Sequence, residues 1–174
     1  MGRAAFERDL WYDRQHLSRS IRKRTWLAIS QDLDHILVKF YAKLKRTGYK
    51  HILDRVNIEA LKRKQTAHWE QIFVYDIDRA YRKRIDRMNK VHNELEIEPT
   101  HYVTAYLYFM NMFQRSILAH AAGPHEAHQM ISAMQIIVSD DLSRSLESYY
   151  RPSTLQISAD FVHAFMDDKG TRQG

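Results

Sequence analysis

Apolar residues recur at a helical period along almost the whole chain. In segment after segment they return every three or four positions, which places them on one side of a helix. No convincing strand and no internal repeat stand out among the 174 residues. The pattern therefore predicts an all-α protein of about seven helices, of which the last two are long.

Capping residues set several of the predicted boundaries. Ser30 and Asn57 can cap helices over residues 31–45 and 58–75, because a serine or asparagine oxygen accepts hydrogen bonds from the free amides of a first turn. Asp76 then begins a shorter helix that ends near His92. The other predicted helices cover residues 4–17, a segment from residue 20, residues 99–121 after Pro99, residues 124–150 after Gly123-Pro124, and residues 153–167.

The last two long helices carry more apolar residues than one small monomer should need. A stripe with four-residue spacing runs from Met130 to Leu146, and Phe113 and Ile117 add to it. This predicts that residues from about 105 to 150 form an antiparallel four-helix bundle between two copies of the chain, a homodimer. The alternative is that the stripe is only the core of a single helix hairpin.

Composition excludes several classes of site. The absence of cysteine rules out disulfides, thiolate-bound zinc, iron–sulfur clusters and a cysteine ligand to haem. No apolar run approaches the roughly 18 residues of a membrane span, and the first residues are too charged for a secretory signal. We therefore expect a soluble cytoplasmic protein with no membrane partner.

The net charge of +6 raises the question of nucleic acid. Basic residues cluster at 19–24, 62–64 and 79–90, but Asp76, Asp78 and Asp86 interrupt the last cluster. Such mixing is typical of a solvated helix face with paired charges. Basic charge alone attracts phosphate without specificity, and no helix-turn-helix or zinc-finger pattern accompanies it. Nucleic acid is therefore not the expected partner.

The segment from residue 90 to residue 102 carries the most informative chemistry. His92 lies at the end of a strongly helical run, Pro99 starts the chain again, and Tyr102 follows ten residues after the histidine. An imidazole can ligate a metal through one nitrogen when its other nitrogen and its ring angle are fixed. His92 is either such a ligand, most simply of haem, or one of ten histidines with an ordinary surface role.

Three segments in order resemble the sensor domain of the globin-coupled sensors, bacterial proteins whose haem-binding globin domain controls an attached output domain. They are the Phe40-Tyr41 pair, residues 61–69 with Phe73 after them, and the segment from His92 to Tyr102. The resemblance covers residues 27–150 and keeps the spacing between the second and third segments. It implies a globin-like fold.

The resemblance implies a role for each residue near the histidine. His92 would bind the iron of haem b through Nε2, with its Nδ1–H held by a backbone carbonyl or a polar neighbour. Tyr102 is the candidate partner, and its alternative role is a core tyrosine on an apolar helix face. Leu95 is an apolar neighbour of the cofactor on the same side.

On the opposite, distal side the resemblance implies three residues. Tyr41 would donate a hydrogen bond to a bound diatomic gas and so favour dioxygen over carbon monoxide; otherwise it is a plain helical aromatic beside Phe40. Gln65 and Ala67 would line the pocket. His68 is another possible iron ligand, but we expect it to point elsewhere, because most positions of a helix face away from any one site.

The chain departs from the family pattern at two positions. Glu96 stands where the family usually has glycine, and His101 where it often has tryptophan. Glycine would relax the turn after the histidine. The glutamate therefore predicts either a different turn geometry or a side chain that points into solvent.

Together these observations divide the chain into an N-terminal helical extension over residues 1–26, a globin sensor domain over 27–151, and a short helix or linker with a tail over 152–174. The predicted function is a dimeric haem-based sensor of dioxygen or another gas (carbon monoxide or nitric oxide). It would signal to an output domain after residue 152 or to a separate protein, without catalysis of its own. The alternatives are a haem-free globin-like interaction module and an oxygen-handling globin without signalling.

Overall fold

The computed structural model describes residues 14–150, with the side chains of residues 14–147. Every regular element in this part of the chain is helical, which confirms the predicted all-α class. The elements are the 3-10 turn η1 (Arg14–His16) and the helices α2 (Arg19–Ser30), α3 (Leu33–Leu44), α4 (Lys50–Leu53), α5 (Ile58–Val74), α6 (Arg79–Glu94), α7 (Pro99–His120) and α8 (Pro124–Tyr150).

The predicted helices with proline at their start are confirmed. Pro99 opens α7 and Pro124 opens α8, at positions where a missing amide hydrogen costs no hydrogen bond. The helix predicted over residues 4–17 lies outside the described residues up to position 13, and its end forms only η1. The helix predicted over 153–167 also lies outside them.

Two predicted helix starts are wrong and one is confirmed. Asn57 caps α5, where the Ala60 amide donates to its side chain over 2.9 Å. Ser30, by contrast, is the last residue of α2, and its hydroxyl donates to the Leu27 carbonyl over 3.1 Å. A serine can serve either end of a helix, so its position in the sequence does not decide which one.

Helix α6 begins at Arg79, three residues after the predicted start at Asp76. Asp78 caps it, accepting from the Tyr81 amide over 2.6 Å. Asp76 instead lies in the loop before the helix, where it is held by Arg22 of α2. The Arg22 guanidinium donates to the Asp76 carboxylate and to the Tyr75 carbonyl, each over 3.1 Å. A contact from α2 therefore keeps this loop extended and sets where α6 begins.

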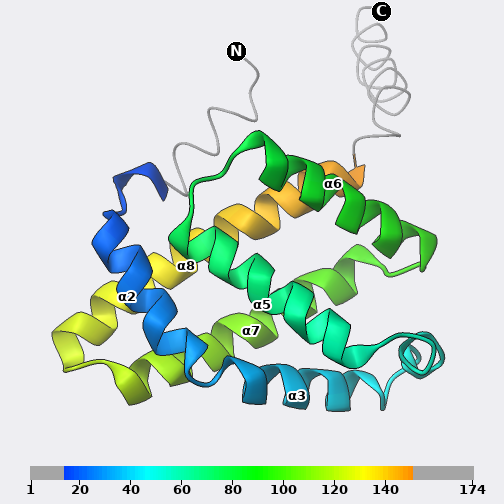
Figure 1. Ribbon diagram of the computed structural model, residues 1–174, viewed down its shortest axis with the longest axis horizontal. Helices are drawn as coiled ribbons and strands as arrows, with labels where there is room; N and C mark the ends of the chain where they lie inside the picture. Colours follow the sequence, from blue (N-terminus) through cyan, green and yellow to red (C-terminus); the bar gives the residue numbers. More distant parts are fainter. Residues whose placement is uncertain (1–13, 151–174) are drawn as a thin grey trace, which may run out of the picture.

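Helix α8 lies at the centre of the arrangement, with α2, α5, α6 and α7 packed on it. Figure 1 shows α7 and α8 running as a hairpin, α3 along one edge, and α5 crossing over α7. Helices α5 and α6 follow each other in sequence, yet they pack on α8 rather than substantially on each other.

The apolar stripe that suggested a dimer is core within one chain. Met130, Met134 and Val138 are at most 4% exposed, and Phe113 and Ile117 are fully buried. Leu142 and Leu146, at the end of the stripe, are half-buried and pack against the core. The part of the stripe up to Val138 is therefore core within one chain, while the predicted dimer through residues 105–150 stays a prediction.

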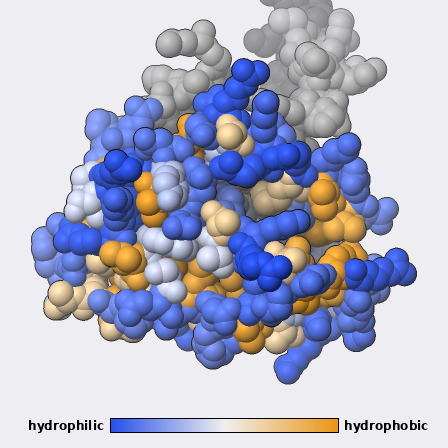
Figure 2. Space-filling model, in the orientation of Figure 1, coloured by the Kyte–Doolittle hydropathy of each residue, from blue (hydrophilic) through white to orange (hydrophobic). Residues whose placement is uncertain are grey.

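None of the helices in the described part of the chain is long and apolar enough to cross a membrane. The face shown in Figure 2 is mostly hydrophilic, with hydrophobic residues gathered at its right-hand side, where the end of α6 and the start of α7 lie in Figure 1. Val91, which is 51% exposed, belongs to this end of α6. The hydrophobic surface therefore lies close to His92.

Candidate functional site

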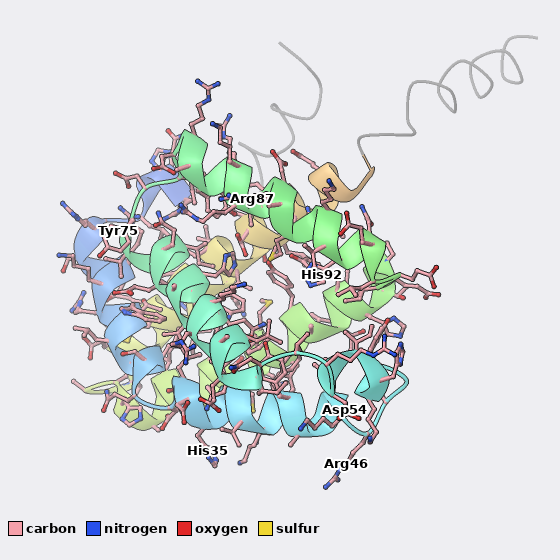
Figure 3. The ribbon with its side chains drawn as sticks, turned by 45° about the vertical axis from the view of Figure 1, so that its right-hand side comes forward. His35, Arg46, Asp54, Tyr75, Arg87 and His92 are labelled. Carbon is pink, nitrogen blue, oxygen red and sulfur yellow. The ribbon has the colours of Figure 1, made fainter. Side chains whose placement is uncertain are left out.

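His92 lies in the last turn of α6 and points from that helix toward the inside of the molecule (Figure 3). Its Nδ1 is 2.9 Å from the Met88 carbonyl oxygen, one helical turn earlier. A carbonyl can only accept, so in the neutral ring Nδ1 carries the hydrogen and Nε2 keeps its lone pair. This is the arrangement that a metal-ligating histidine requires.

Burial lowers the pKa of His92, although the bond to Met88 acts in the opposite direction. Desolvation disfavours the charged imidazolium, so the neutral ring predominates at neutral pH. The Nε2 lone pair is then available to a Lewis acid without loss of a proton.

Tyr102 fixes the angle of the His92 ring by contact. The two ring centroids lie 5.3 Å apart at 79°, an edge-to-face arrangement. The Tyr102 hydroxyl is directed to the Met88 sulfur at 3.8 Å, so the hydrogen bond to Nδ1 comes from the backbone and the predicted tyrosine partner acts through packing. Leu95, at the end of α6, is half-buried.

The turn after His92 has the left-handed backbone that usually favours glycine, although Glu96 occupies that position. Glu96 has φ of 53°, the one positive value among the described non-glycine residues. The Ile97 amide donates to the His92 carbonyl and the Glu96 amide to the Asn93 carbonyl, both over 3.0 Å. This pair of bonds is a Schellman motif with a left-handed residue at its usual position. The Glu96 side chain is exposed, as one of the two alternatives predicted.

Replacing Glu96 with glycine is expected to raise the free energy of unfolding by about 1 kcal/mol, because glycine enters the left-handed region without the Cβ clash. Urea unfolding monitored by circular dichroism measures the change. Glu96→Ala is the matched control: it removes the charge and keeps the clash, so it should not stabilise the protein comparably. Equal stability of the two variants would contradict this account of the turn.

Tyr41 lies on α3 and is 7% exposed. Burial raises its pKa to about 12, so the phenol stays protonated and can donate a hydrogen bond. Its ring packs on Phe40 at 5.3 Å, and no described residue is paired with its hydroxyl. The Tyr41 side chain is therefore mostly buried and protonated, with a hydroxyl that can donate a hydrogen bond.

Two further buried polar atoms lie on α5. Neither Gln65 Oε1 nor Trp69 Nε1 has a hydrogen-bond partner among the described residues. A buried polar atom without a partner costs roughly 1–3 kcal/mol, so such atoms usually belong to a site that a ligand or water completes. Gln65 and Trp69 are four residues apart on one helix face.

Ala67 does not join this face. It is exposed and borders a shallow hollow on the outer surface with Asp34, Lys62 and Glu70. Two residues along a helix rotate the side chain by about 200°, so Ala67 and Gln65 cannot share a face. The prediction that Ala67 lines the pocket is therefore not supported, whereas Gln65 is placed inward.

His68 points elsewhere, as expected. Its Nε2 lies 2.9 Å from Asp141 Oδ2 on α8. His101 is also on the surface, where its Nδ1 lies 2.7 Å from the Tyr49 hydroxyl and ties the α4 region to α7. Neither histidine competes with His92 for the interior.

A continuous series of aromatic rings joins the two sides of the site. From Tyr41 it passes through Phe40 to Phe109 at 4.8 Å, then to Trp69 at 5.1 Å. From Trp69 it continues through Tyr106 and Tyr102, at 5.8 and 5.1 Å, to His92 at 5.3 Å. Helix α7 supplies the central rings because residues four and three apart fall on one side. The predicted proximal and distal residues thus border one interior region.

Asp141 is a buried functional group that the sequence reasoning missed. It is 1% exposed and accepts hydrogen bonds from Tyr81, Tyr106 and His68. Burial alone would raise the pKa of Asp141, but His68 and the three donated bonds hold it below its usual value. A signal was present: Asp141 falls four residues after Ile137 on the apolar stripe of α8.

The residues present fit a haem group. On α6 a half-buried histidine keeps its Nε2 without a described partner. The Tyr41 hydroxyl on α3 and the polar atoms Gln65 Oε1 and Trp69 Nε1 on α5 also lack partners among the described residues. An apolar, aromatic-lined region with few polar groups is typical of a site for a large planar cofactor.

The helix order and the crossing of α5 over the α7–α8 hairpin match a globin fold, with the half-buried His92 at the end of α6. The family model described as Protoglobin matches residues 15–153. The chain therefore belongs to the protoglobin family, a family of haem-binding globins, which confirms the resemblance seen in the sequence.

Among solved structures, the globin domain of a Geobacter sulfurreducens globin-coupled sensor is similar, with a TM-score of 0.68 and 14% identity. The match covers 83% of this chain and 97% of that domain, and at this identity it shows the fold alone. No curated protein matches the chain.

Proposed function

We propose that this chain is a haem-based gas sensor domain that holds haem b through His92, with dioxygen as its gas. The observation that carries the proposal is the state of His92: its ring is neutral, oriented by Tyr102, and bonded through Nδ1 to a backbone carbonyl so that Nε2 is free. A histidine that only faces solvent does not need a fixed ring angle and a fixed Nδ1 hydrogen.

Haem would supply an iron centre that binds a diatomic gas reversibly. The chain's own residues do the rest. His92 would hold the iron, the half-buried Leu95 would pack beside it, and the aromatic side chains of α7 would contact the cofactor. Gln65 and Trp69 supply polar atoms on the opposite side.

Tyr41 supports the choice of dioxygen. Its phenol is protonated and without a described partner, so it can donate to a gas that carries partial negative charge. Dioxygen gains more than carbon monoxide from such a donor. Discrimination between the two gases then depends on one hydroxyl hydrogen.

Replacing Tyr41 with phenylalanine is expected to lower dioxygen affinity about tenfold while carbon monoxide affinity changes much less, because a hydrogen bond contributes roughly 1 kcal/mol or somewhat more. Equilibrium titration of the ferrous protein with each gas measures both. Tyr108→Phe is the control, since the Tyr108 hydroxyl pairs with the Ile36 carbonyl at 3.5 Å. Parallel losses for both gases would remove Tyr41 from this role.

The dimer proposed for the sensor would use the outer side of α7. Leu107 and Leu118 are each 58% exposed and eleven residues apart, which places them on one helix face. Asn111 and Gln114 lie between them on that face and are also exposed. This seam could pair with a second copy about a two-fold axis and relay the ligand state to an output domain after residue 152 or to a separate partner.

One spectroscopic experiment tests the proposed function. Purified chain, supplied with haem, should give a strong haem absorption band that changes in distinct ways on reduction and on addition of dioxygen or carbon monoxide. A protein that stays colourless when haem is added would refute the proposal and favour a haem-free interaction module.

A further inference from the structure

The buried carboxylate of Asp141 is not explained by haem binding. It receives a hydrogen bond from each of three helices: from Tyr81 on α6, from Tyr106 on α7 over 2.6 Å, and from His68 on α5 over 2.9 Å. Asp141 itself lies on α8. One side chain therefore joins four helices.

A contribution to stability does not by itself explain why a buried carboxylate stands at this position. A buried ionised group carries a desolvation penalty that its partners barely repay, and apolar replacements of buried ionic clusters are often neutral or stabilising. Polar clusters of this kind instead specify one relative position of the elements that they join, because each donor must stay within hydrogen-bonding distance. The question is which position is being specified.

The carboxylate fixes α6, the helix that carries His92. Tyr81, Ile85 and Asn89 are the buried residues of α6, on the side of the helix where His92 also lies. Asn89 Nδ2 donates to the Ser145 carbonyl on α8 over 2.7 Å. Helix α6 is thus tied to α8 at two places, by Tyr81 to Asp141 and by Asn89 one turn further along α8.

A second connection runs through α7. Tyr106, which donates to Asp141, packs on Tyr102 with ring centroids 5.1 Å apart. Tyr102 in turn stands edge-on to His92. The orientation of the His92 ring therefore depends on the same carboxylate by two routes, through the backbone of α6 and through the rings of α7.

Helix α5, on the distal side of the proposed site, also contacts Asp141. His68 lies three residues after Gln65 and next to Trp69 on α5, and its Nε2 hydrogen is directed to Asp141. Helices from both sides of the proposed haem site therefore converge on one residue of α8, the helix that leads into the C-terminal segment.

We infer that Asp141 is a positioning residue that couples His92 to α8, so that a displacement of His92 moves α8 and the position of α8 sets the strength of the bond between His92 and haem. This inference rests on the proposed function. The neighbouring Asp140 provides a natural comparison: it is 2% exposed, but the hydrogen bonds described for it run to Arg144 within α8.

The test uses the full chain loaded with haem and the variant Asp141→Asn, which keeps the size of the side chain and one acceptor oxygen and removes the charge. Resonance Raman spectroscopy of the ferrous, ligand-free protein reports the iron–histidine stretching frequency. Hydrogen exchange with and without carbon monoxide reports the response of the α8 amides. We expect a shifted frequency and loss of the ligand-dependent change in α8, with both readouts unchanged in Asp140→Asn.

The inference is overturned if Asp141→Asn binds haem and matches the wild type in both readouts. Should that variant fail to fold, Tyr81→Phe and Tyr106→Phe each remove one hydroxyl and are expected to shift both readouts in the same direction by less; wild-type values in both of them would overturn the inference as well. A wild-type chain that takes up no haem would instead refute the proposed function, so the two failures are distinguishable.

Discussion

Replacing His92 with alanine is expected to give a folded protein that has lost most of the haem band of the wild type. The side chain is only half-buried, so its removal costs the fold little. Changes to groups that merely orient a metal ligand lower metal affinity by about 10–100-fold, and removal of the ligand itself should cost at least as much. Titration of the haem-free protein with haem, followed by absorbance, measures the affinity.

His101→Ala is the matched control for this experiment. His101 lies nine residues away, is exposed, and its Nδ1 pairs with Tyr49. The variant should keep the wild-type band and haem affinity. A band of wild-type strength in His92→Ala would show that another residue holds the iron, while added imidazole should partly restore the band if the cavity left by His92 is the site.

Replacing Asp141 with alanine is expected to lower the free energy of unfolding by about 3–5 kcal/mol, because removal of one partner from a buried polar cluster leaves the others without compensation. The Tyr81 and Tyr106 hydroxyls would both lose their acceptor, and His68 would lose its carboxylate partner. Urea unfolding of the haem-free protein measures the loss independently of the cofactor.

Asp140→Ala provides the comparison in the same helix turn. Its described partner Arg144 is 23% exposed at the side chain and can turn to solvent, so we expect a cost less than half as large. An equal decrease in the free energy of unfolding in Asp140→Ala and Asp141→Ala would show that the Asp141 cluster does not stabilise the fold more than the Asp140–Arg144 pair does.

Much of the fold could be predicted from the sequence because helix formation depends on residues that lie close together along the chain. The apolar period, together with Asn57, Pro99 and Pro124, indicated the long helices and their starts to within a few residues. Ser30 and Asp76 misled for a different reason. Ser30 can serve either end of a helix and here ends α2, where its hydroxyl donates to the Leu27 carbonyl. Asp76 can form a local cap, but a contact with Arg22 of α2 holds it outside α6.

The candidate site divides in the same way. His92, Tyr102 and Tyr41 were found through a spacing that survives in the sequence, and the structure places all three in or against the interior. Ala67 was assigned to the pocket because the rotation of α5 about its axis cannot be read from a short motif; packing of Trp69 against α7 sets that rotation.

Glu96 shows that a departure from a family pattern can leave the backbone unchanged. The sequence suggested that glutamate in place of glycine would either alter the turn or point outward. The left-handed conformation is kept and the side chain lies in solvent, because two backbone hydrogen bonds close the helix end whatever the side chain is. The expected consequence is a cost in stability, which the Glu96→Gly variant measures.

By itself, the sequence determined the helical class, the main helix starts and the segment that carries the histidine, since these depend on residues near one another along the chain. Only the tertiary structure decided which stripe is core, which nitrogen of His92 is free and that Asp141 joins four helices. Those features arise between residues up to 73 positions apart, as between His68 and Asp141, and no local pattern encodes such a meeting.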